Sequence, residues 1–455
     1  MATLTRELAA HALRTRFEDL PDGAVLAARR SIMDAVGVAL AAGTLGQVTP
    51  AFVALARNSG TGPCKIIGHD LWVAPAVAAL VNGAMSHALD YEDTHDGGLV
   101  HPNGTALPAA LAIAQLVGSV SGRDFITAIA LAADITARLG LCMGNVDTPR
   151  GWSIRPLLGT YGATAAAGRL LGLSQEQLVE AFGLAFSQAT CSAGFFGYPP
   201  SHMREVRDGF GAQAAVTAVL LARGGVRSYD QTIEGPQGLF ALYAGGQWDA
   251  DRLMAGLGRV FEGENLSFKP WPSCRGTHAF VEAALELRQC HRIAATDIEQ
   301  VHADVSDMFR VLCEPFDQKC RPVTANDAKF SLPFTAATAL THGQLGLAQF
   351  LPAALVDPAV LALSRRFRCE ARPPAAGDAL RGSLTVVLRD GQTLTHTVQE
   401  PLGGPDRPLR EAALVEKFVD CARYAVCALD EPQARRVAAA LGSLDAGDGL
   451  QALQV

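Results

Sequence analysis

The sequence predicts a mainly α protein with two domains: a large all-helical domain (residues 1–265 and 403–455) and a smaller α+β domain (residues 266–402). Three observations support this division. Apolar residues recur at helical spacing up to Asn265. Beyond that point, two β-like runs flank an Asp-Gly turn. A chain of 455 residues also exceeds the usual size of a single core.

The predicted large domain is rich in Ala, Leu and Gly. Helical periodicity is clear in Ala24–Ala42 and Ala74–Leu89, and Gly or Asn often follows such segments, as at helix C-termini. Small residues dominate Gly162–Leu173, which suits close helix packing. The apolar stretch Gly104–Gly140 is interrupted at Gly118. We therefore expect two buried helices there, not a membrane span of about 20 apolar residues.

The smaller domain is predicted from strand patterns. Apolar and polar residues partly alternate in Asp297–Val305, as in a half-buried strand. Leu384–Leu388 and Leu394–Val398 are β-like runs separated by a turn that contains Asp390-Gly391. An Asp-Gly pair between two such runs indicates a β-hairpin.

The C-terminal segment returns to helix. A Gly/Pro-rich stretch, Pro401–Pro408, ends the smaller domain, and helical character resumes in Leu409–Leu429. We expect this helix to rejoin the large domain.

Composition excludes several classes of protein. The net charge of −7 and the absence of a Lys/Arg-rich run argue against a nucleic-acid surface. The N-terminal residues Met1–Glu7 lack the apolar core of a signal peptide. The ten cysteines form no C-x-x-C pair and no Cys/His zinc motif. We therefore expect a cytoplasmic protein with reduced thiols, without membrane, nucleic-acid or metal partners.

The first candidate site is the segment SHALDYEDTHD (residues 86–96) together with HPNG (residues 101–104). Four acids and three histidines lie between Ser86 and His101, beside a Gly-rich loop. A histidine close to an acid can be held in one tautomer and act as an acid or base near neutral pH. The alternative is a solvated acidic loop with a capping Asp.

The second candidate site is KPWPSCRGTH (residues 269–278), at the proposed domain boundary, where ligands often bind. Lys269, Arg275 and His278 have the charges needed to hold an anionic group. An ordinary solvated linker is the alternative. Cys274 with His278 as its base would suggest a nucleophile, but no third member of such a site is apparent, and cysteine is often a small buried hydrophobe.

The third candidate site is HMREVRDG (residues 202–209). Arg204 and Arg207 share one face if this segment is helical. Arginine binds carboxylates in bidentate geometry. The alternative is a surface cluster of Arg, Glu and Asp that would contribute little to stability.

Two other functions are considered. Asp90 and Asp93 could bind Mg²⁺ if they faced one cavity, as in an all-α, metal-dependent synthase. The β-hairpin and the Lys269 loop have no place in that hypothesis. A helical scaffold or binding protein is the non-enzymatic alternative. A dinucleotide site is not indicated, because Gly159-Thr160-Tyr161-Gly162 does not match G-x-G-x-x-G.

Four motifs in order resemble the MmgE/PrpD family: SHALDYEDTH…HPNGTALPAALA, GTYGATAAAGRLLGL, KPWPSCRGTHAFVEAAL and NDAKFSLPFTAATAL. The resemblance covers nearly the whole chain. Members include 2-methylcitrate dehydratase, cis-aconitate decarboxylase and iminodisuccinate epimerase. The family implies a large all-helical domain with a smaller α+β lid domain, a cytosolic or mitochondrial homodimer, and no metal or organic cofactor.

The family's site residues map onto this chain position by position. Asp90 and Thr94 match its active-site acid and threonine, and His101 matches the histidine of its H-P element. Lys269 and His278 match the Lys and His of its lid boundary.

Two departures concern proton carriers. Ser153 stands where many members have a histidine. Arg204 and Arg207 replace a Lys followed three residues later by His. These changes keep the charge that binds carboxylates, but they put 2-methylcitrate itself in doubt as the substrate.

The resulting hypothesis is a cofactor-independent dehydratase that removes a proton next to a carboxylate of a small di- or tricarboxylate. A decarboxylase or an epimerase on the same scaffold is the alternative. Lys269 and Arg204 are expected to clamp substrate carboxylates, with Arg207 or Arg275. His101, oriented by Asp90, is expected to transfer the proton, with His278 or Lys269 as the partner acid; Lys269 becomes the base instead if burial lowers its pKa.

Overall fold

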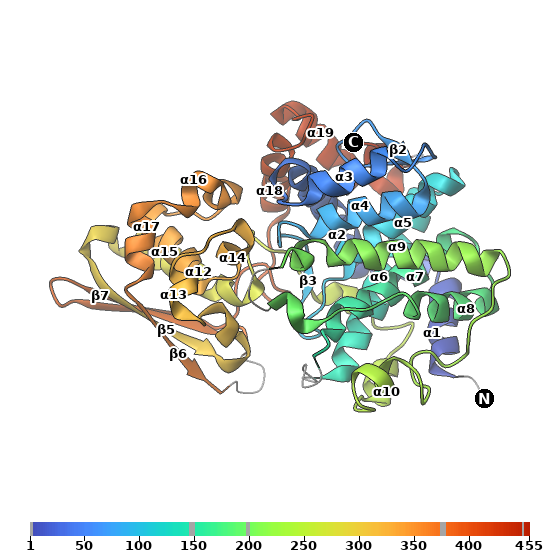
Figure 1. Cartoon of the computed structure of the whole chain (residues 1–455), viewed down its shortest axis with the longest axis horizontal. Coiled ribbons are helices and arrows are strands. Elements are labelled where there is room, and N and C mark those ends of the chain that lie inside the picture. Colours follow the sequence, from blue (N-terminus) through green and yellow to red (C-terminus); the bar gives the residue numbers. More distant parts are fainter. Residues whose placement is uncertain (1–2, 145–150, 197–200, 374–378, 448–449) are drawn as a thin grey trace. The chain divides into compact units, whose positions relative to one another are not determined.

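The computed structural model describes residues 3–144, 151–196, 201–373, 379–447 and 450–455, which form two compact units (Figure 1). Unit 1 comprises Met1–Ala88, Glu92–Phe268 and Arg410–Val455, and unit 2 comprises Leu89–Tyr91 and Lys269–Leu409. The predicted fold class, mainly α with a smaller sheet-containing part, is confirmed. The observed borders follow residues 268 and 409, where the sequence suggested 265 and 402, and unit 2 also takes three residues of the first candidate site.

Unit 1 is built from helices whose apolar faces form its core. Its helices are α1 (Leu4–Arg14), α2 (Asp22–Leu45), α3 (Thr49–Arg57), α4 (Pro75–His87), α5 (Pro102–Val117), α6 (Gly122–Met143), α7 (Ile154–Leu170), α8 (Gln175–Phe186), α9 (Met203–Arg223), α10 (Leu239–Tyr243), α11 (Ala250–Met254), α18 (Glu411–Arg423) and α19 (Glu431–Gly442).

The centre of unit 1 is the bundle of α4, α5, α7 and α9, in which each helix packs against others of the set. Glycines allow the closest approach. A Cβ built on Gly83 of α4 would lie 2.7 Å from the Cα of Gly209 in α9, a distance that real Cβ atoms essentially never show. The two glycines therefore let the backbones of α4 and α9 meet directly, which brings the C-terminus of α4 to the first turns of α9.

The stretch Gly104–Gly140 forms two buried helices, as predicted. Helix α5 ends at Gly118, which has a left-handed φ of 79°, and α6 begins after Ser121, whose side chain accepts from the Asp124 amide. Of the described helices, α6 alone is long and apolar enough to cross a membrane by itself. The burial of 94% of its most apolar window matches a core helix. Helices α2 and α3 would qualify only as one span, and they are bent by 91°.

Unit 1 also contains two short antiparallel ladders that the sequence analysis did not anticipate. Strands β1 (Cys64–Lys65) and β2 (Trp72–Val73) form one ladder, and β3 (Thr94–His95) and β4 (Leu266–Ser267) form the other. A ladder of two residues per strand is too short to leave a periodic pattern. The second ladder fixes the segment between α4 and α5 that carries the first candidate site.

The C-terminal segment belongs to unit 1, and α18 packs against α2. A buried ion pair joins the two helices, with Lys417 Nζ 2.6 Å from Asp34 Oδ1. Burial raises the pKa of Asp34 to about 6, although Lys417 opposes the shift. The contact ties the C-terminal segment to α2, and Ser31 of α2 binds Asp93 in the first candidate site.

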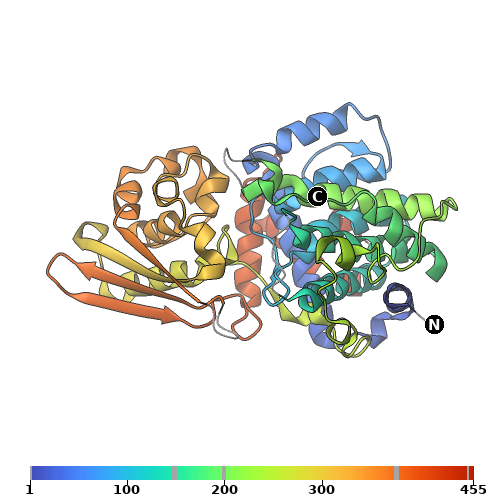
Figure 2. The same ribbon diagram turned by 60° about the horizontal axis from the view of Figure 1, so that its bottom comes forward.

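Unit 2 contains a four-stranded sheet of order β6-β5-β7-β8 (Figure 2). Strands β5 and β6 are parallel, and the other pairs are antiparallel. The elements are α12 (His278–His291), β5 (Ile298–Ser306), α13 (Phe316–Cys320), α14 (Ala325–Lys329), α15 (Leu332–His342), α16 (Pro352–Leu355), α17 (Pro358–Ser364), β6 (Phe367–Arg372), β7 (Gly382–Leu388) and β8 (Thr393–Val398).

The sheet follows from its sequence pattern. The predicted hairpin is present as β7 and β8, whose turn is closed by the Leu388 amide donating to the Gln392 carbonyl at 2.8 Å. Gly391 supplies the left-handed φ of 89° that the turn requires. Alternate residues of β7 are buried, and α12 packs on β7 and β8. The parallel pair β5–β6 is connected through the helices α13 to α17, because parallel neighbours need a long crossover.

Candidate active site

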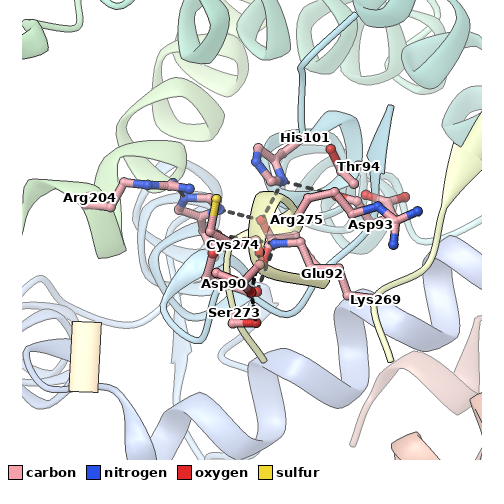
Figure 3. Close-up of polar contacts among 12 residues, drawn as sticks. Asp90, Glu92, Asp93, Thr94, His101, Arg204, Lys269, Ser273, Cys274 and Arg275 are labelled. Atoms are coloured by element: carbon pink, nitrogen blue, oxygen red, sulfur yellow. Dashed lines mark hydrogen bonds and ion pairs between the residues drawn. The ribbon is translucent and has the colours of Figure 1, made fainter. Parts of the chain in front are cut away.

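A cluster of two histidines, a glutamate and an arginine lies at the centre of unit 1. His87, the last residue of α4, places Nδ1 2.6 Å from Glu92 Oε1, and its Nε2 contacts Arg204 Nη1 of α9. His101 places Nδ1 2.9 Å from the same Glu92 oxygen and 3.2 Å from the Asp93 carbonyl oxygen (Figure 3). The two imidazoles meet edge to face, with 5.3 Å between ring centroids.

The hydrogen-bond partners fix the tautomers of both histidines. An arginine can only donate, so Nε2 of His87 accepts from Arg204, and its proton is on Nδ1, which donates to Glu92. Burial lowers the pKa of His87, which favours this neutral form. Nδ1 of His101 faces two acceptors, Glu92 and the Asp93 carbonyl, so it too carries a proton. In the neutral ring, Nε2 of His101 is then the basic nitrogen.

Helix α5 and Asp93 hold His101 in place. His101 is the N-cap residue of α5, with Pro102 at the first helical position. The carboxylate of Asp93 accepts from Ser31 Oγ and Asn103 Nδ2, both at 2.6 Å. Asp93 is buried, which raises its pKa to about 6. Because Asp93 binds both α2 and the first turn of α5, its backbone carbonyl is a fixed acceptor for His101.

The two arginines of the third candidate site lie in the first turns of α9, on the side that faces the histidines. Arg204 is buried and contacts His87. The side chain of Arg207 is 9% exposed, and its Nε donates to Asp208 Oδ1 at 3.2 Å. Burial, and next the charge of Arg204, lower the pKa of Arg207. Asp208 also approaches His87, with 3.6 Å between its Oδ2 and Nδ1.

Thr94 and Ser153 have positioning contacts in unit 1. The Thr94 hydroxyl donates to the Val100 carbonyl at 3.1 Å, which closes the turn that precedes His101. Ser153 is buried at the N-terminus of α7, and its amide donates to the Cys191 carbonyl at 2.8 Å. Leu99, within the turn, has a left-handed φ of 52°. Such a conformation costs a residue with a side chain about 1–2 kcal/mol and is often found at functional sites.

In unit 2, Lys269 and Asp90 form a fully buried pair. Lys269 Nζ donates to the Asp90 backbone carbonyl at 2.8 Å and lies 3.2 Å from Asp90 Oδ1 (Figure 3). Asp90 also has a left-handed φ of 50°. Tyr91 fixes the same segment, because its hydroxyl donates to the Pro270 carbonyl at 3.1 Å. Two of the sequence-predicted residues, Lys269 and Asp90, are thus brought together.

Arg275 and His278 hold the backbone of unit 2. Arg275 donates to the carbonyls of Leu402 and Pro401 at 2.8 and 3.1 Å. His278 is completely buried, with Nδ1 3.4 Å from Arg275 Nη1 and Nε2 3.2 Å from the Ser273 carbonyl. Burial, and next the charges of Arg275 and Lys269, lower the pKa of His278 well below its usual range. Neither nitrogen of His278 is left to activate the Cys274 thiol.

The acids required by the metal-dependent hypothesis have other partners. Asp90 is paired with Lys269, and Asp93 with Ser31 and Asn103. Among the described residues, one group of side chains could hold a metal ion. Its members are His87, Glu92 and His101, whose possible ligand atoms lie within 4.8 Å of one another. Hydrogen bonds already join these atoms, and the guanidinium of Arg204 on His87 opposes a further cation.

Sequence reasoning missed Glu92, His87 and Asp208 as members of the site. We expected Asp90 to orient His101, but the structure gives that role to Glu92 and the Asp93 carbonyl, while Asp90 contacts Lys269. All these residues lie in or beside the quoted motifs. Their spacing could not separate neighbouring acids, because the segment between α4 and α5 is irregular and has no fixed side-chain period.

Comparisons with known proteins cover nearly the whole chain. Residues 6–251 match the MmgE/PrpD N-terminal domain and residues 271–442 the MmgE/PrpD C-terminal domain. A cis-aconitate decarboxylase-like protein, oryM, of Aspergillus oryzae is 26% identical over 97% of this chain and 94% of its own length. The cis-aconitate decarboxylase of Aspergillus terreus is 24% identical (91% of this chain, 88% of its own). That of Mus musculus is 26% identical (90% and 84%).

The two domain matches follow each other along the chain and together cover most of it, and the relatives are aligned over most of their own length. The resemblance inferred from the four sequence motifs is therefore confirmed: the chain belongs to the MmgE/PrpD family and is an enzyme.

Proposed function

We propose that this enzyme is a cofactor-independent lyase that transfers a proton at a carbon next to a carboxylate of a small di- or tricarboxylate. The observation that carries the proposal is the state of His101. Its Nδ1 is committed to Glu92 and the Asp93 carbonyl. Its Nε2 has no hydrogen-bond partner among the described residues, and the side chain is 17% exposed. A histidine held this way can take up or deliver a proton at Nε2.

Decarboxylation is the first candidate reaction, because the relatives are named cis-aconitate decarboxylases. Loss of CO₂ leaves an electron pair on carbon, and a proton must be delivered there. Protonated His101 supplies that proton and returns to its neutral form. Dehydration, the reaction that the sequence analysis ranked first, remains the second candidate. It begins with the reverse transfer, from carbon to neutral His101, and needs an acid for the leaving hydroxyl.

The remaining site residues are assigned supporting roles. Arg204 binds a substrate carboxylate, because a guanidinium forms bidentate charge-assisted hydrogen bonds with such groups. Its contact with His87 fixes its position. Lys269, held by Asp90, is proposed to bind another carboxylate. His278 and Arg275 support the Lys269 loop, since their hydrogen bonds are directed at backbone carbonyls. Thr94 fixes the turn before His101.

The test is proton exchange in D₂O, followed by NMR, with protein treated with a chelator. The panel contains cis-aconitate, citrate, 2-methylcitrate and aspartate-derived acids. Loss of CO₂ with one deuterium in the product supports decarboxylation, and a new or hydrated alkene supports dehydration. Exchange at the α-carbon alone supports epimerisation. If folded protein gives neither exchange nor product with any of these acids, the proposed function is wrong.

The proposal extends to assembly and location. As the family resemblance implies, we propose a cytoplasmic homodimer. Sedimentation equilibrium of the purified protein measures the mass of the assembly directly. A monomer at all concentrations that support activity would rule out the dimer.

A further inference from the structure

A small pocket in unit 1 lies next to His101. It is lined in part by His101, Thr105, Arg155, Gly159, Arg207 and Asp208, and its volume is about 10 Å³. That is roughly the space one water molecule needs. The pocket can therefore take one oxygen atom, either of a water molecule or of a ligand group that enters from outside.

Three helices begin at this pocket. His101 and Thr105 belong to the start of α5, Arg155 and Gly159 to the first turns of α7, and Arg207 to the first turns of α9. The N-terminus of a helix carries a partial positive charge and unpaired amide donors. The helix starts near the pocket add positive potential there, which favours a negatively charged occupant.

Arg207 provides an independent reason for an anion. Its side chain is 91% buried, Nε donates to Asp208, and the guanidinium carbon lies 5.0 Å from the centre of the Phe195 ring. No described residue accepts a hydrogen bond from either terminal nitrogen of Arg207. A carboxylate oxygen is the acceptor that a guanidinium binds most strongly.

Arg155 brings a second positive charge to the pocket and fixes its wall. Its Nη1 donates to the Gly98 carbonyl at 2.6 Å, and its Nη2 to the Gly144 carbonyl at 3.2 Å. Arg155 therefore ties the turn before His101 to α7. Asp208 is the acid among the described lining residues, and it is already compensated by Arg207 and by His87 at 3.6 Å, so it opposes an incoming anion only weakly.

We propose that Arg155 and Arg207 form an anion subsite that binds one carboxylate of the substrate, in addition to the carboxylate assigned to Arg204. This inference rests on the proposed function and narrows it, because a further binding group in unit 1 favours an acid that carries an additional carboxylate. An oxygen of that carboxylate enters the pocket and accepts hydrogen bonds from the terminal nitrogens of Arg207. Arg155 is a specificity-determining residue that places the charge and shapes the wall.

The test measures binding without turnover. Isothermal titration calorimetry compares tricarballylate with glutarate, which has the same five-carbon backbone but lacks the central carboxylate. Wild-type protein is expected to bind tricarballylate at least about tenfold more tightly, as one charge-assisted hydrogen-bonded pair allows. Arg155→Met and Arg207→Met are each expected to reduce that ratio to about threefold or less, and Arg207→Lys to retain part of it.

Arg169→Met is the matched control. Arg169 lies at the other end of α7 and, like Arg155, donates to two backbone carbonyls, those of Ala12 and Leu13. This variant should keep the full ratio. Equal affinities of the wild type for the two acids, or a ratio preserved in Arg155→Met and Arg207→Met, would overturn the subsite. The proposed function fails separately. If the affinity ratio of tricarballylate to glutarate is as expected but no proton exchange occurs, only the reaction is refuted. If proton exchange occurs but the two acids bind equally well, only the subsite is refuted.

Discussion

His101 of unit 1 and His278 of unit 2 were both predicted catalytic residues, and their surroundings differ in one decisive respect. His101 has one nitrogen committed to acceptors, and its other nitrogen has no hydrogen-bond partner in the part of the chain that the structure describes. His278 has both nitrogens engaged, by Arg275 and by the Ser273 carbonyl, and no exposed surface. A proton carrier needs one fixed and one open nitrogen, so we propose that His101 transfers the proton and that His278 supports the backbone.

The charges around the two histidines point the same way. The carboxylate of Glu92 lies 2.9 Å from Nδ1 of His101, so a negatively charged group adjoins this ring. Burial, and next the positive charges of Arg275 and Lys269, lower the pKa of His278 well below the usual range. A histidine that stays neutral cannot deliver a proton near neutral pH. Motif membership therefore does not distinguish a catalytic histidine from a structural one, whereas the contacts do.

The largest expected effect separates the two histidines directly. His101→Ala should lower kcat on the active acid by at least about 100-fold, because a general acid–base group typically contributes that much or more. The variant should remain folded, because Glu92 keeps its hydrogen bond from His87. His278→Gln should instead lower the free energy of unfolding by about 2–3 kcal/mol, because two buried hydrogen bonds are lost.

Steady-state kinetics and urea unfolding on the same preparations check both histidine variants. The kcat of His278→Gln, corrected for the folded fraction, should fall less than about tenfold. His342→Ala, on the surface of unit 2, controls for loss of a histidine that pairs with an acid. If activity is lost in the His278 variant and kept in the His101 variant, His278 and not His101 is the proton carrier.

The next effect concerns Lys269. Its ion pair with Asp90 in unit 2 joins a basic side chain to a buried acid, as the contact of His101 with Glu92 does in unit 1. Lys269→Met should destabilise the fold by about 3 kcal/mol, because removing one partner leaves the Asp90 charge buried. Lys269→Met/Asp90→Asn should recover most of that stability, since no charge remains.

The double variant decides whether Lys269 binds substrate. If it does, kcat/KM of the stable double variant stays at least about tenfold below wild type, because a charge-assisted contact to a carboxylate is absent. Urea unfolding and kcat/KM are measured together. A double variant with wild-type kcat/KM would show that the pair is structural only.

The sequence predicted the regular parts of this molecule well and the irregular parts poorly. The strand β5 and the β7–β8 hairpin were found because their side chains alternate, and the helices α5 and α6 because Gly118 breaks an apolar run. The motifs located the candidate site but did not single out Glu92, which contacts His101. Which of several adjacent carboxylates reaches a histidine depends on the turns of a loop, here including the left-handed Asp90.

A smaller effect tests the acid that supports His101. The folded-state pKa of Asp93, about 6, lies above its ordinary value because burial disfavours the charged form. A raised pKa contributes stability that is complete below the ordinary value and is lost as pH rises through about 6. Between pH 5 and 7.5 Asp93 should therefore lower the free energy of unfolding by about 1 kcal/mol.

The Asp93→Asn variant removes that ionisation while keeping the backbone carbonyl that accepts from His101. Chemical unfolding is measured at pH 5 and at pH 7.5. Between these values the free energy of unfolding of the variant should fall by about 1 kcal/mol less than that of the wild type. Asp406→Asn, on an exposed loop, should leave the decline unchanged. An Asp93→Asn decline equal to that of wild type would show that Asp93 does not titrate in this range.

The smallest expected effect is none at all, and it tests whether the unit 1 cluster functions through protons. His87, Glu92 and His101 are the three described side chains that could hold a metal ion together. Protons on both Nδ1 atoms already fill the space between them, and Arg204 adds a positive charge beside His87. Dialysis against EDTA and phenanthroline should therefore leave kcat unchanged. Activity lost on dialysis and restored by Zn²⁺ or Mg²⁺ would mean that a metal ion, not the proton on Nδ1, orients His101, and the assignment of its Nε2 as the proton carrier would fail with it.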